Sequence, residues 1–545
     1  MRAICCVALG AASASWAWDV QAEHARRRPV SLCVKTTRRK LLIGAAAIAA
    51  LPRLSTAAAE PQDEFYETVV KGKAASPAKK APTSDADPLP SALKDLDYDH
   101  YRMINFRPDR AFWRDGGLFQ VQLFHRGFQY DRKVTINLIE NGNTTQLSYS
   151  PDLFDFRANT FNQDFPPTLG FSGFRLHFPI NRPDHYDEVA VFQGASYYRL
   201  LARGLRFGAS LRGLAINTAD PHGEEFPYFT EFWLERPSRN AATMKVYGLL
   251  ESKSATGAFR FLIAPRDRTT AQVKAEIYPR AKIKKLGIAP ITSMYLHGKA
   301  SPRRFADLRP EVHDSDGLLM RTGRDERIWR PLINPTALQI SEFFDVAPNA
   351  FGLIQRERRF SAYEDLESGY ENRPSIMIEP DGYWGDGAVE LVEIPTDAEK
   401  NDNISAYWVP KQPVRVGWPL TFAYGVSIFA SDRDDQPLAR CVATFVGPVV
   451  AVDLAKDDGG SPRRFWLDFR TRASAVQPDD ARLTAQVSAS TGKVDDVHCE
   501  SAGADAWRVA FRYSPDGTKA ADIRAVLSTD GRPVSETWIY RWAPP

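Results

Sequence analysis

The stretch "KVTINLIENGNTTQLSYS" (Lys133–Ser150) places Asn141 and Gly142 between two runs in which apolar and polar residues alternate. Alternation with a period of two is typical of a β-strand with one buried face. An Asn-Gly pair between two such runs is a strong signal for a tight hairpin turn. We therefore expect two antiparallel strands here, joined at Asn141-Gly142.

The same pattern recurs along the chain. Strand-like segments include "LFQVQLFHRGF" (118–128), "DEVAVFQGASYYRLL" (187–201), "TEFWLERP" (230–237), "MKVYGLLES" (244–252) and "GAFRFLIAP" (257–265). Stretches with a helical period are few and short. Many strands separated by Gly, Pro and Asp turns favour an all-β fold, so we expect a large antiparallel β-sandwich over residues 60–432.

A second unit is expected at the C-terminal end. The polar, proline-bearing stretch "ASDRDDQPLAR" (430–440) precedes it, and we interpret 433–440 as a linker. Residues 441–545 contain six or seven short strand-like runs at a spacing of roughly ten residues, which is typical of an immunoglobulin-like β-sandwich.

Residues 1–59 have the features of a leader. Arg38 and Arg39 precede an apolar run over 41–51, which is too short to span a bilayer, and small residues ending at Ala59 offer a cleavage site. The pair resembles a twin-arginine export signal, with an ordinary secretory signal as the alternative. Either predicts export, with cleavage after Ala59. A true start at Val34 is a hypothesis, because "VKTTRRKLLIG" would be a normal beginning for such a signal.

The charge balance argues against a nucleic-acid partner. Nine of the 70 basic residues and two of the 67 acidic ones lie in 1–59, which leaves 61 basic against 65 acidic residues, a net charge of −4. A mildly acidic body lacks the basic surface that binding to a phosphate backbone requires.

Only two cysteines, Cys441 and Cys499, lie beyond the leader. In an oxidising compartment two cysteines make one disulfide a candidate. Two buried thiols are the alternative, because pairing geometry cannot be read from a sequence.

Several classes of enzyme are disfavoured by the motifs. The chain has no Gly-Lys phosphate loop, no dinucleotide-binding glycine fingerprint after a strand, no HExxH and no CxxC. Its nine histidines are scattered singly. We therefore expect no metal and no cofactor.

Aromatic residues lie among carboxylates in two segments. "YEDLESGYENRPSIMIEPDGYWGDGAVELVEIPTDAEKNDNISAYWVP" (363–410) and "RDERIWRPLINP" (324–335) contain Tyr370, Tyr383, Trp384, Tyr407, Trp408 and Trp329, the last followed by Arg330. Flat aromatic faces pack on the C–H surface of sugars, while carboxylates and arginines bind hydroxyl groups. The composition favours a sugar cleft, with strand residues of a core as the alternative.

The chain resembles a known family in several segments. "LDYDHYRMINFRPDRAFWR", "FQVQLFHRGF", "HDSDGL", "WRPLINP", "FGLIQRERRFSAYEDLESGYENRPSIMIEP", "WGDGAVELVEIPT" and "NDNISAYWVP" are similar to the periplasmic glucan biosynthesis proteins, MdoG/MdoD (OpgG/OpgD). The similarity covers essentially the whole chain beyond the leader. The twin-arginine leader favours the OpgD-like branch.

The resemblance implies a mutarotase-like β-sandwich joined to a smaller immunoglobulin-like domain, and a role in making osmoregulated periplasmic glucans. It also implies an inverting endo-β-1,2-glucanase. On that pattern "EKNDN" points to Asp402 as the general acid and "HDSDG" points to Asp314 as the general base, with Asp316 as a turn residue. An inverting enzyme needs its two carboxyls about 6.5–9.5 Å apart to admit a water molecule.

Other residues are assigned supporting roles on the same pattern. Asp402 must hold a proton near neutral pH, and the charge of Glu399 is expected to raise its pKa. Tyr370 and His313 are candidates for tuning or extending a proton relay. The expected substrate-binding set is His313, Trp329, Arg330, Arg373, Tyr383, Trp384, Tyr407 and Trp408.

The expected partner is β-1,2-glucan, with the inner-membrane glucan synthase as a further candidate. Two other functions stay open at this point: a non-catalytic glucan-binding or assembly factor, and a branching transglycosylase. Asp314 and Asp402 could also be simple turn residues.

Overall fold

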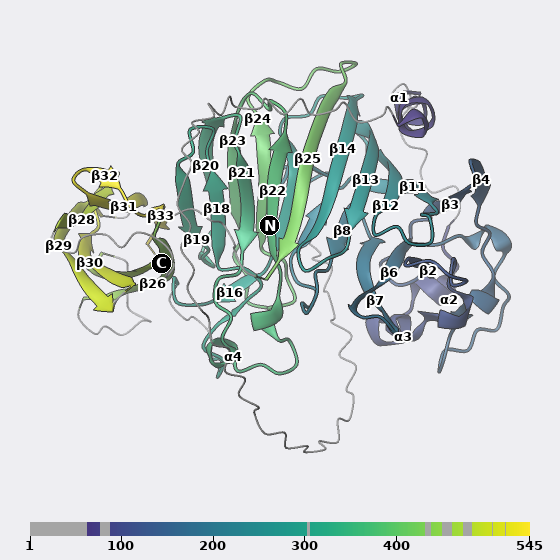
Figure 1. Cartoon of the computed structure of the whole chain (residues 1–545), viewed down its shortest axis with the longest axis horizontal. Helices are drawn as coiled ribbons and strands as arrows, with labels where there is room; N and C mark the ends of the chain where they lie inside the picture. Colours follow the sequence, from purple (N-terminus) through teal and green to yellow (C-terminus); the bar gives the residue numbers. More distant parts are fainter. Residues whose placement is uncertain are drawn as a thin grey trace, which may run out of the picture.

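Figure 1 shows the computed structural model of the chain. The structure describes residues 63–76, 88–301, 306–430, 438–449, 460–471, 482–503, 505–517 and 519–544. The leader, with its arginine pair and expected cleavage site, lies outside the described residues, as does most of the expected linker.

The hairpin predicted from Lys133–Ser150 is confirmed. β3 (Thr135–Glu140) and β4 (Asn143–Gln146) pair antiparallel, with Glu140 opposite Asn143. The φ angles of Asn141 and Gly142 are 51° and 80°. A two-residue hairpin turn of this type needs positive φ at both positions, which Asn and Gly adopt most readily.

The first of two large sheets carries the candidate site at one end. Its strand order is β2 (Gln120–Phe124), β6 (Gly173–Arg182), β7 (His185–Gln193), β8 (Tyr197–Leu200), β9 (Ser210–Arg212), β15 (Leu286–Ser293), β24 (Ile404–Pro410), β23 (Asp386–Glu393) and β20 (Gln339–Val346), and β10 (Leu214–Ile216) also pairs with β15. All of its described pairings are antiparallel.

The second sheet runs from the N-terminal hairpin into the C-terminal unit. Its order is β4, β3, β11 (Tyr228–Glu235), β12 (Met244–Glu251), β13 (Ala255–Ala264), β14 (Thr269–Pro279), β25 (Leu420–Phe429), β22 (Ser375–Asp381), β21 (Ala350–Ile354), β18 (Gly317–Arg321), β19 (Arg327–Pro331), β33 (Thr537–Trp542), β31 (Ala521–Thr529) and β28 (Leu483–Ala489), with β32 (Arg532–Pro533) on β31. Two of its pairings, β3 with β11 and β19 with β33, are parallel.

The two sheets share one apolar core. Phe192 of β7 contacts Phe174 of β6 and, across the layers, Phe261 of β13, with ring centroids 4.9 and 5.3 Å apart. All three rings are buried. Burying one such side chain stabilises the fold by about 1.5–3 kcal/mol. The expected all-β sandwich is therefore what the chain forms.

The C-terminal unit pairs four strands into a sheet of its own. Their order is β26 (Arg440–Pro448), β27 (Arg463–Arg470), β30 (Ala506–Ser514) and β29 (Lys493–Gly503). Phe465, Phe511 and Trp538 pack between this sheet and β33. The apolar cluster of this unit also contains residues of the large sandwich, among them Leu319 and Trp329, and β33 pairs with β19. The two parts are thus joined by backbone hydrogen bonds as well as by the chain.

The candidate disulfide does not form. Cys441 lies on β26 and Cys499 on β29, at opposite edges of the four-stranded sheet, and the structure records both as thiols. Three strand spacings put their Cα atoms about 14 Å apart, whereas a disulfide tolerates about 7 Å at most. The alternative of two thiols holds.

Helices and small two-stranded sheets complete the fold. The described helical segments are Tyr66–Val70 (η1), Lys71–Ala75 (α1), Ser91–Lys94 (α2), Tyr98–Met103 (α3), Pro108–Arg110 (η3), Pro151–Leu153 (η4), Pro167–Leu169 (η5), Phe360–Tyr363 (α4) and Tyr370–Asn372 (η6). β1 (Asn105–Phe106) pairs with β5 (Phe154–Asp155), and β16 (Tyr295–His297) pairs with β17 (Val312–His313).

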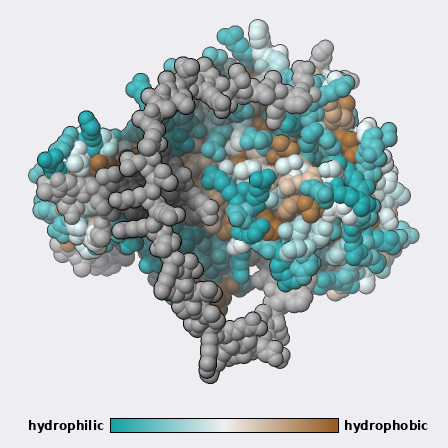
Figure 2. Space-filling view, viewed as in Figure 1, coloured by the Kyte–Doolittle hydropathy of each residue, from teal (hydrophilic) through white to brown (hydrophobic). Residues whose placement is uncertain are grey.

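The last feature of the fold is the polarity of its surface. Figure 2 shows a face that is mostly hydrophilic, with small apolar patches. Within the described ranges, no helix combines the length and the apolar character needed to cross a bilayer.

Candidate functional site

Asp402 and Asp314 flank one backbone segment, where β15 leads into β16 at the lower end of the sandwich in Figure 1. Asn403, next to Asp402, accepts the Tyr295 N–H at 2.8 Å and donates to the Tyr295 carbonyl at 3.1 Å. On the other chain segment, the Asp314 N–H donates to the Met294 carbonyl at 2.9 Å. Two segments far apart in the sequence therefore carry their acids to neighbouring positions.

The Asp402 carboxyl is in the environment that a proton donor needs. Its residue is partly exposed, and no described residue hydrogen-bonds to this carboxyl. Burial is the main cause that raises the pKa of Asp402 from 3.8 to about 6; the negative charge of Asp314 adds to the shift, while Arg199 and Arg373 oppose it. A carboxyl with this pKa holds its proton for part of the time near neutral pH.

Asp314 has a different balance of forces. Burial raises the pKa of Asp314 above its usual value, and the guanidinium groups of Arg373 and Arg199 oppose that rise only in part. Arg373 Nε lies 3.5 Å from Asp314 Oδ1, and neither atom has a hydrogen-bond partner. Two cations near one carboxylate favour its ionised form. Among the described residues, Asp314 has an arginine within ion-pair distance and Asp402 does not, so Asp314 is the better candidate for the ionised acid.

Arg199 is a site residue that the sequence interpretation missed. It lies on β8, and its Nε donates to Ser210 Oγ on the next strand at 2.7 Å. Its positive charge acts on both Asp402 and Asp314. The only local signal was one charged residue inside the strand-like run "YYRLL", which says nothing about which acids it will face.

Tyr370 and Glu399 join the site through Arg309. The Tyr370 hydroxyl donates to Glu399 Oε2 at 3.3 Å, and Arg309 Nη1 lies 2.7 Å from the same oxygen and 2.8 Å from Asp365 Oδ2. Glu399 was expected to raise the pKa of Asp402, and this is corrected: the neighbouring like charge comes from the other acid. Since Arg309 pairs with its carboxylate, Glu399 instead anchors the loop that carries Asp402.

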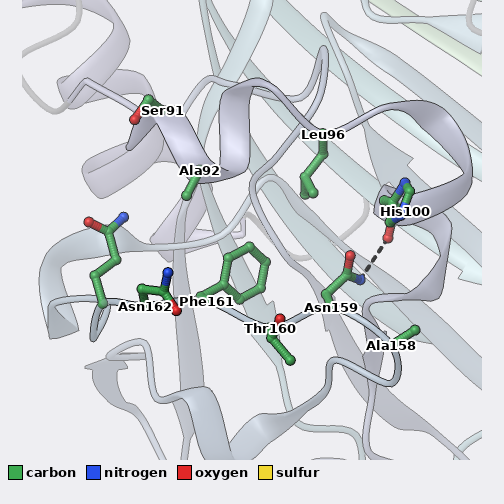
Figure 3. Close-up of a pocket in the computed structure, with 10 residues that line it drawn as sticks. Ser91, Ala92, Leu96, His100, Ala158, Asn159, Thr160, Phe161 and Asn162 are labelled. Carbon is green, nitrogen blue, oxygen red and sulfur yellow. Dashed lines mark hydrogen bonds between the residues drawn. The ribbon is translucent and has the colours of Figure 1, made fainter.

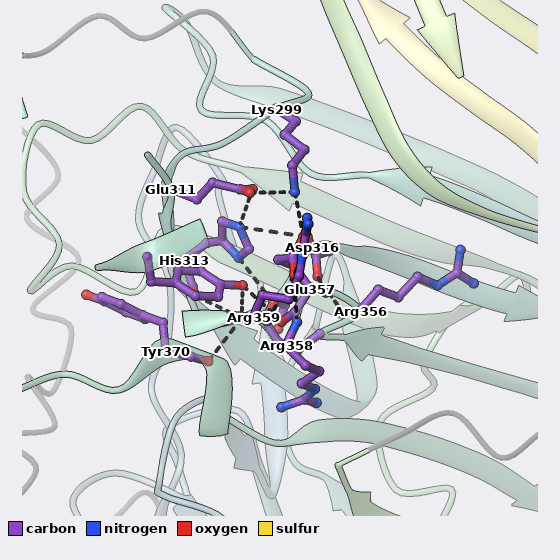
Figure 4. A network of polar contacts seen from close by, with 12 residues as sticks. Lys299, Glu311, His313, Asp316, Arg356, Glu357, Arg358, Arg359 and Tyr370 are labelled. Atoms are coloured by element: carbon purple, nitrogen blue, oxygen red, sulfur yellow. Dashed lines mark hydrogen bonds and ion pairs between the residues drawn. The ribbon is translucent and has the colours of Figure 1, made fainter. Parts of the chain in front are cut away.

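His313 lies in a buried polar network with Glu311, Asp316 and Lys299 (Figure 4). It is 0% exposed, with Nδ1 3.1 Å from Gln355 Oε1 and Nε2 3.2 Å from Glu311 Oε2. Gln355 also donates to the His313 carbonyl at 3.3 Å and to the Tyr370 carbonyl at 3.2 Å. The expected contact of His313 with substrate is therefore wrong, because the ring is enclosed by protein.

Three groups of this network have spacings that a metal site could have. One ligand atom each from Glu311, His313 and Asp316 lies within 4.8 Å of the others. However, Lys299 Nζ lies 2.6 Å from Glu311 Oε1. Burial lowers the pKa of His313, but the Asp316 and Glu311 carboxylates outweigh it and raise that pKa. Because a protonated imidazole offers no lone pair and Lys299 already neutralises Glu311, we interpret the cluster as an ion network.

Most of the expected aromatic platform belongs to the core. Tyr407 and Trp408 are 0% exposed, Trp329 is 3% exposed and Trp384 is 8% exposed. Arg330 is also enclosed, with Nη2 2.7 Å from Glu393 Oε2. These five residues cannot stack on or bind a sugar in this structure, so their assignment to the substrate is corrected. Along β24 consecutive residues are buried, because both faces of the strand are covered.

Tyr383 is exposed but lies at the wrong end of the sheet. It is 76% exposed, in the hairpin between β22 and β23. Glu393 pairs with Ile404 next to Asp402, whereas Asp386 begins β23 at the opposite end. The length of β23 separates the two ends by about 23 Å. Tyr383 therefore does not lie beside the two acids.

The sheet surface beside the acids offers buried polar atoms without partners. Ser210, Thr292 and Ser405 lie opposite one another on β9, β15 and β24, in register with the end of β8 that carries Arg199. Thr292 Oγ1 and Ser405 Oγ are buried and have no hydrogen-bond partner. Buried hydroxyls are normally bonded to protein, water or ligand. The exposed fractions of the three residues are only 1–5%, so the protein encloses this row as it encloses Trp384.

A surface pocket lies elsewhere, between α2, α3 and residues 158–163 (Figure 3). His100 and Phe161 line it, and Asn159 Nδ2 donates to the His100 carbonyl at 2.9 Å. None of its lining residues carries a carboxylate. The pair of acids, rather than this pocket, is thus the place for acid–base chemistry.

Comparisons with known proteins point to one family. The model of the family "Periplasmic glucan biosynthesis protein, MdoG" matches residues 65–542. The chain is 45% identical over 515 residues to glucans biosynthesis protein G of Rhodopseudomonas palustris, covering 93% of this chain and 99% of that protein. It is 43% identical over 514 residues to the protein of the same name from Bradyrhizobium diazoefficiens, covering 93% and 100%. With Vibrio cholerae glucans biosynthesis protein G it shares 44% identity over 474 residues, covering 85% and 84%.

Proposed function

Since this chain belongs to the MdoG family of periplasmic glucan biosynthesis proteins, we propose that it is an inverting endo-β-1,2-glucanase that cleaves the glucan backbone. In this proposal Asp402 is the general acid and Asp314 is the general base.

One observation carries the proposal: the two neighbouring carboxyls have different partners, since Arg373 Nε lies 3.5 Å from Asp314 Oδ1 whereas no described residue hydrogen-bonds to the Asp402 carboxyl. Burial and the Asp314 charge raise the pKa of Asp402 to about 6; burial also raises the pKa of Asp314, and Arg199 and Arg373 oppose the rise at both acids. Glycoside hydrolysis with inversion needs one protonated and one ionised carboxyl.

The proposed reaction uses Asp402 in its protonated form and Asp314 in its ionised form. Asp402 donates its proton to the glycosidic oxygen as the bond from that oxygen to the anomeric carbon breaks. Asp314 takes a proton from a water molecule, whose oxygen attacks the same carbon from the opposite face. The configuration at this carbon inverts, and one new reducing end forms for each bond cleaved. The Tyr370 hydroxyl, next to Glu399 and within the field of Asp314, is a candidate for extending the path of this proton.

The test is the release of reducing ends from linear β-1,2-glucan, with sizing of the products. Asp402→Asn and Asp314→Asn should each lower kcat at least about 10³-fold, because each removes an acid or base that acts only in the transition state. The matched control is Asp397→Asn, an exposed residue in the same loop as Asp402.

Three outcomes would replace the proposal. Intact glucan after long incubation with folded protein excludes hydrolysis. Glucan binding that survives both substitutions, without cleavage, identifies a binding or assembly factor. New linkages at a constant number of reducing ends identify a branching transglycosylase.

The site of action is a second part of the proposal. The leader predicts twin-arginine export to the periplasm with cleavage after Ala59, and the inner-membrane glucan synthase is the proposed source of the polymer. Sequencing the N-terminus of the exported protein tests the cleavage, and a mature chain that begins far from Glu60 refutes it. Blocking the twin-arginine pathway should keep the protein in the cytoplasm.

A further inference from the structure

We propose that Glu536 in the C-terminal unit is a positioning residue for Asp314, acting through Arg356 and Asp316. The inference rests on the proposed function for its effect on catalysis. It gives the C-terminal unit a role in the active site, although no residue of that unit belongs to the pair of acids.

The connection begins at a carboxylate that is completely enclosed. Glu536 is 0% exposed, and its two oxygens lie 2.6 and 3.0 Å from the Nη atoms of Arg356. It also accepts the Cys441 N–H at 2.7 Å, and Arg327 Nε lies 3.3 Å from it. The Arg356 guanidinium stacks on the Trp329 ring, 3.5 Å from its centroid. Charge-assisted, two-pronged pairing fixes an arginine in both position and orientation.

Arg356 in turn holds the segment that contains Asp314 (Figure 4). The backbone N–H groups of Arg356 and Glu357 donate to Asp316 Oδ2 at 2.5 and 2.8 Å. The Asp316 N–H donates to the Ile354 carbonyl at 2.9 Å. The start of the 356–357 segment and the turn that joins β17 to β18 are therefore fixed to each other through one carboxylate.

Asp314 is two residues from Asp316 in the same turn. Its own N–H is bonded to the Met294 carbonyl, and its carboxylate faces Arg373. The turn is held at several points: at the Met294 carbonyl, at Ser315, whose Oγ lies 2.9 Å from Ser293 Oγ, at the Asp316 carbonyl, which accepts the Leu332 N–H at 2.9 Å, and at the Asp316 carboxylate. Only the last of these depends on the segment that the Glu536–Arg356 pair fixes. Since an error of about 1 Å in the position of a reacting group can cost about 100-fold in rate, this anchor matters for catalysis.

Arg327 provides a matched control. Its side chain is 3% exposed, against 6% for that of Arg356, and it binds the same Glu536 carboxylate, but it lies on β19. On β19, the residue opposite the start of β18 at Gly317 is Pro331, whereas Arg327 pairs with Arg321 at the other end of β18. Loss of its ion pair should weaken the contact between the two parts of the protein without moving the turn that carries Asp314.

The experiment compares the full-length wild type with Glu536→Gln, Arg356→Lys and Arg327→Lys. Hydrogen exchange is followed by mass spectrometry in peptides covering residues 312–318, and kcat and KM are measured on linear β-1,2-glucan. In Glu536→Gln and Arg356→Lys we expect exchange in 312–318 to be at least about tenfold faster, and kcat to fall about 10- to 100-fold with KM changed less than about threefold. Arg327→Lys should leave both within about threefold of the wild type.

The outcomes separate this inference from the proposed function. Unchanged exchange in 312–318 in the Arg356→Lys protein overturns the positioning role, whatever the activity. Faster exchange with unchanged kcat shows that the Glu536–Arg356 anchor does not matter for catalysis. If Arg327→Lys loses as much exchange protection and kcat as Arg356→Lys, the anchor contributes only to general stability. A wild type that cleaves no glucan refutes the proposed function instead, while the exchange data still decide whether Glu536 holds the turn.

Discussion

Replacing Asp402 by Asn should abolish glucan cleavage and stabilise the fold near neutral pH. The carboxyl has no hydrogen-bond partner among the described residues, and burial together with the Asp314 charge penalises its ionised form. Asn has nearly the same shape but no charge. It therefore removes the penalty together with the transferable proton.

The magnitude follows from the pKa of Asp402, which rises from 3.8 to about 6 on folding. A shift of about two units corresponds to about 3 kcal/mol at a pH above both values. Because the native state binds the proton more tightly than the unfolded chain, ionisation costs stability as the pH rises from about 4 to above 6, and the cost is absent below about pH 4. Since Asp402 is partly exposed, solvent screening reduces the expected gain of Asp402→Asn to about 1–3 kcal/mol.

Urea unfolding of both proteins at about pH 4 and about pH 7.5 measures this difference. The gain of Asp402→Asn over the wild type should be near zero at the lower pH and positive at the higher pH. Asp397→Asn, in the same loop, should show no such gain. A stability difference that does not change with pH would refute the reasoning. For the wild type, kcat should fall as the pH rises through about 6, since Asp402 loses the proton it must donate.

Three further substitutions test the arrangement around the site. Arg309→Gln should lower kcat about tenfold by releasing Glu399 and the loop of Asp402, with little change in the urea midpoint; an unchanged kcat contradicts the anchoring role. Tyr383→Ala should leave kcat/KM for glucan within about twofold, because this exposed ring lies far from the two acids. A large loss would show that the ring contacts the substrate. Arg330→Met should lower the free energy of unfolding by about 3–5 kcal/mol, because Glu393 is then a buried charge without this ion-pair partner. A decrease of less than about 1 kcal/mol would contradict the burial of the pair.

Local patterns determined much of the fold. The Asn141-Gly142 turn follows from backbone preferences that act within four residues, and alternation in β3 reports a strand whatever surrounds it. The segments around Asp314 and Asp402 were found through resemblance to a family, since their spacing alone is compatible with simple turns. From the sequence we could say which protonation state each acid needs for the reaction, but not whether its surroundings favour that state.

Tertiary structure decided which charges and rings meet. Arg199 reaches the acids only because β8 lies in the same sheet as β15 and β24, and Glu399 pairs with Arg309 from a segment distant in sequence. Trp408 is core rather than platform because both faces of β24 are covered, and period-two alternation does not say whether the outer face meets water or protein. Strand identity is a local property of the chain. Burial, pKa and ion pairing depend on long-range neighbours, so only the assembled sheets could assign them.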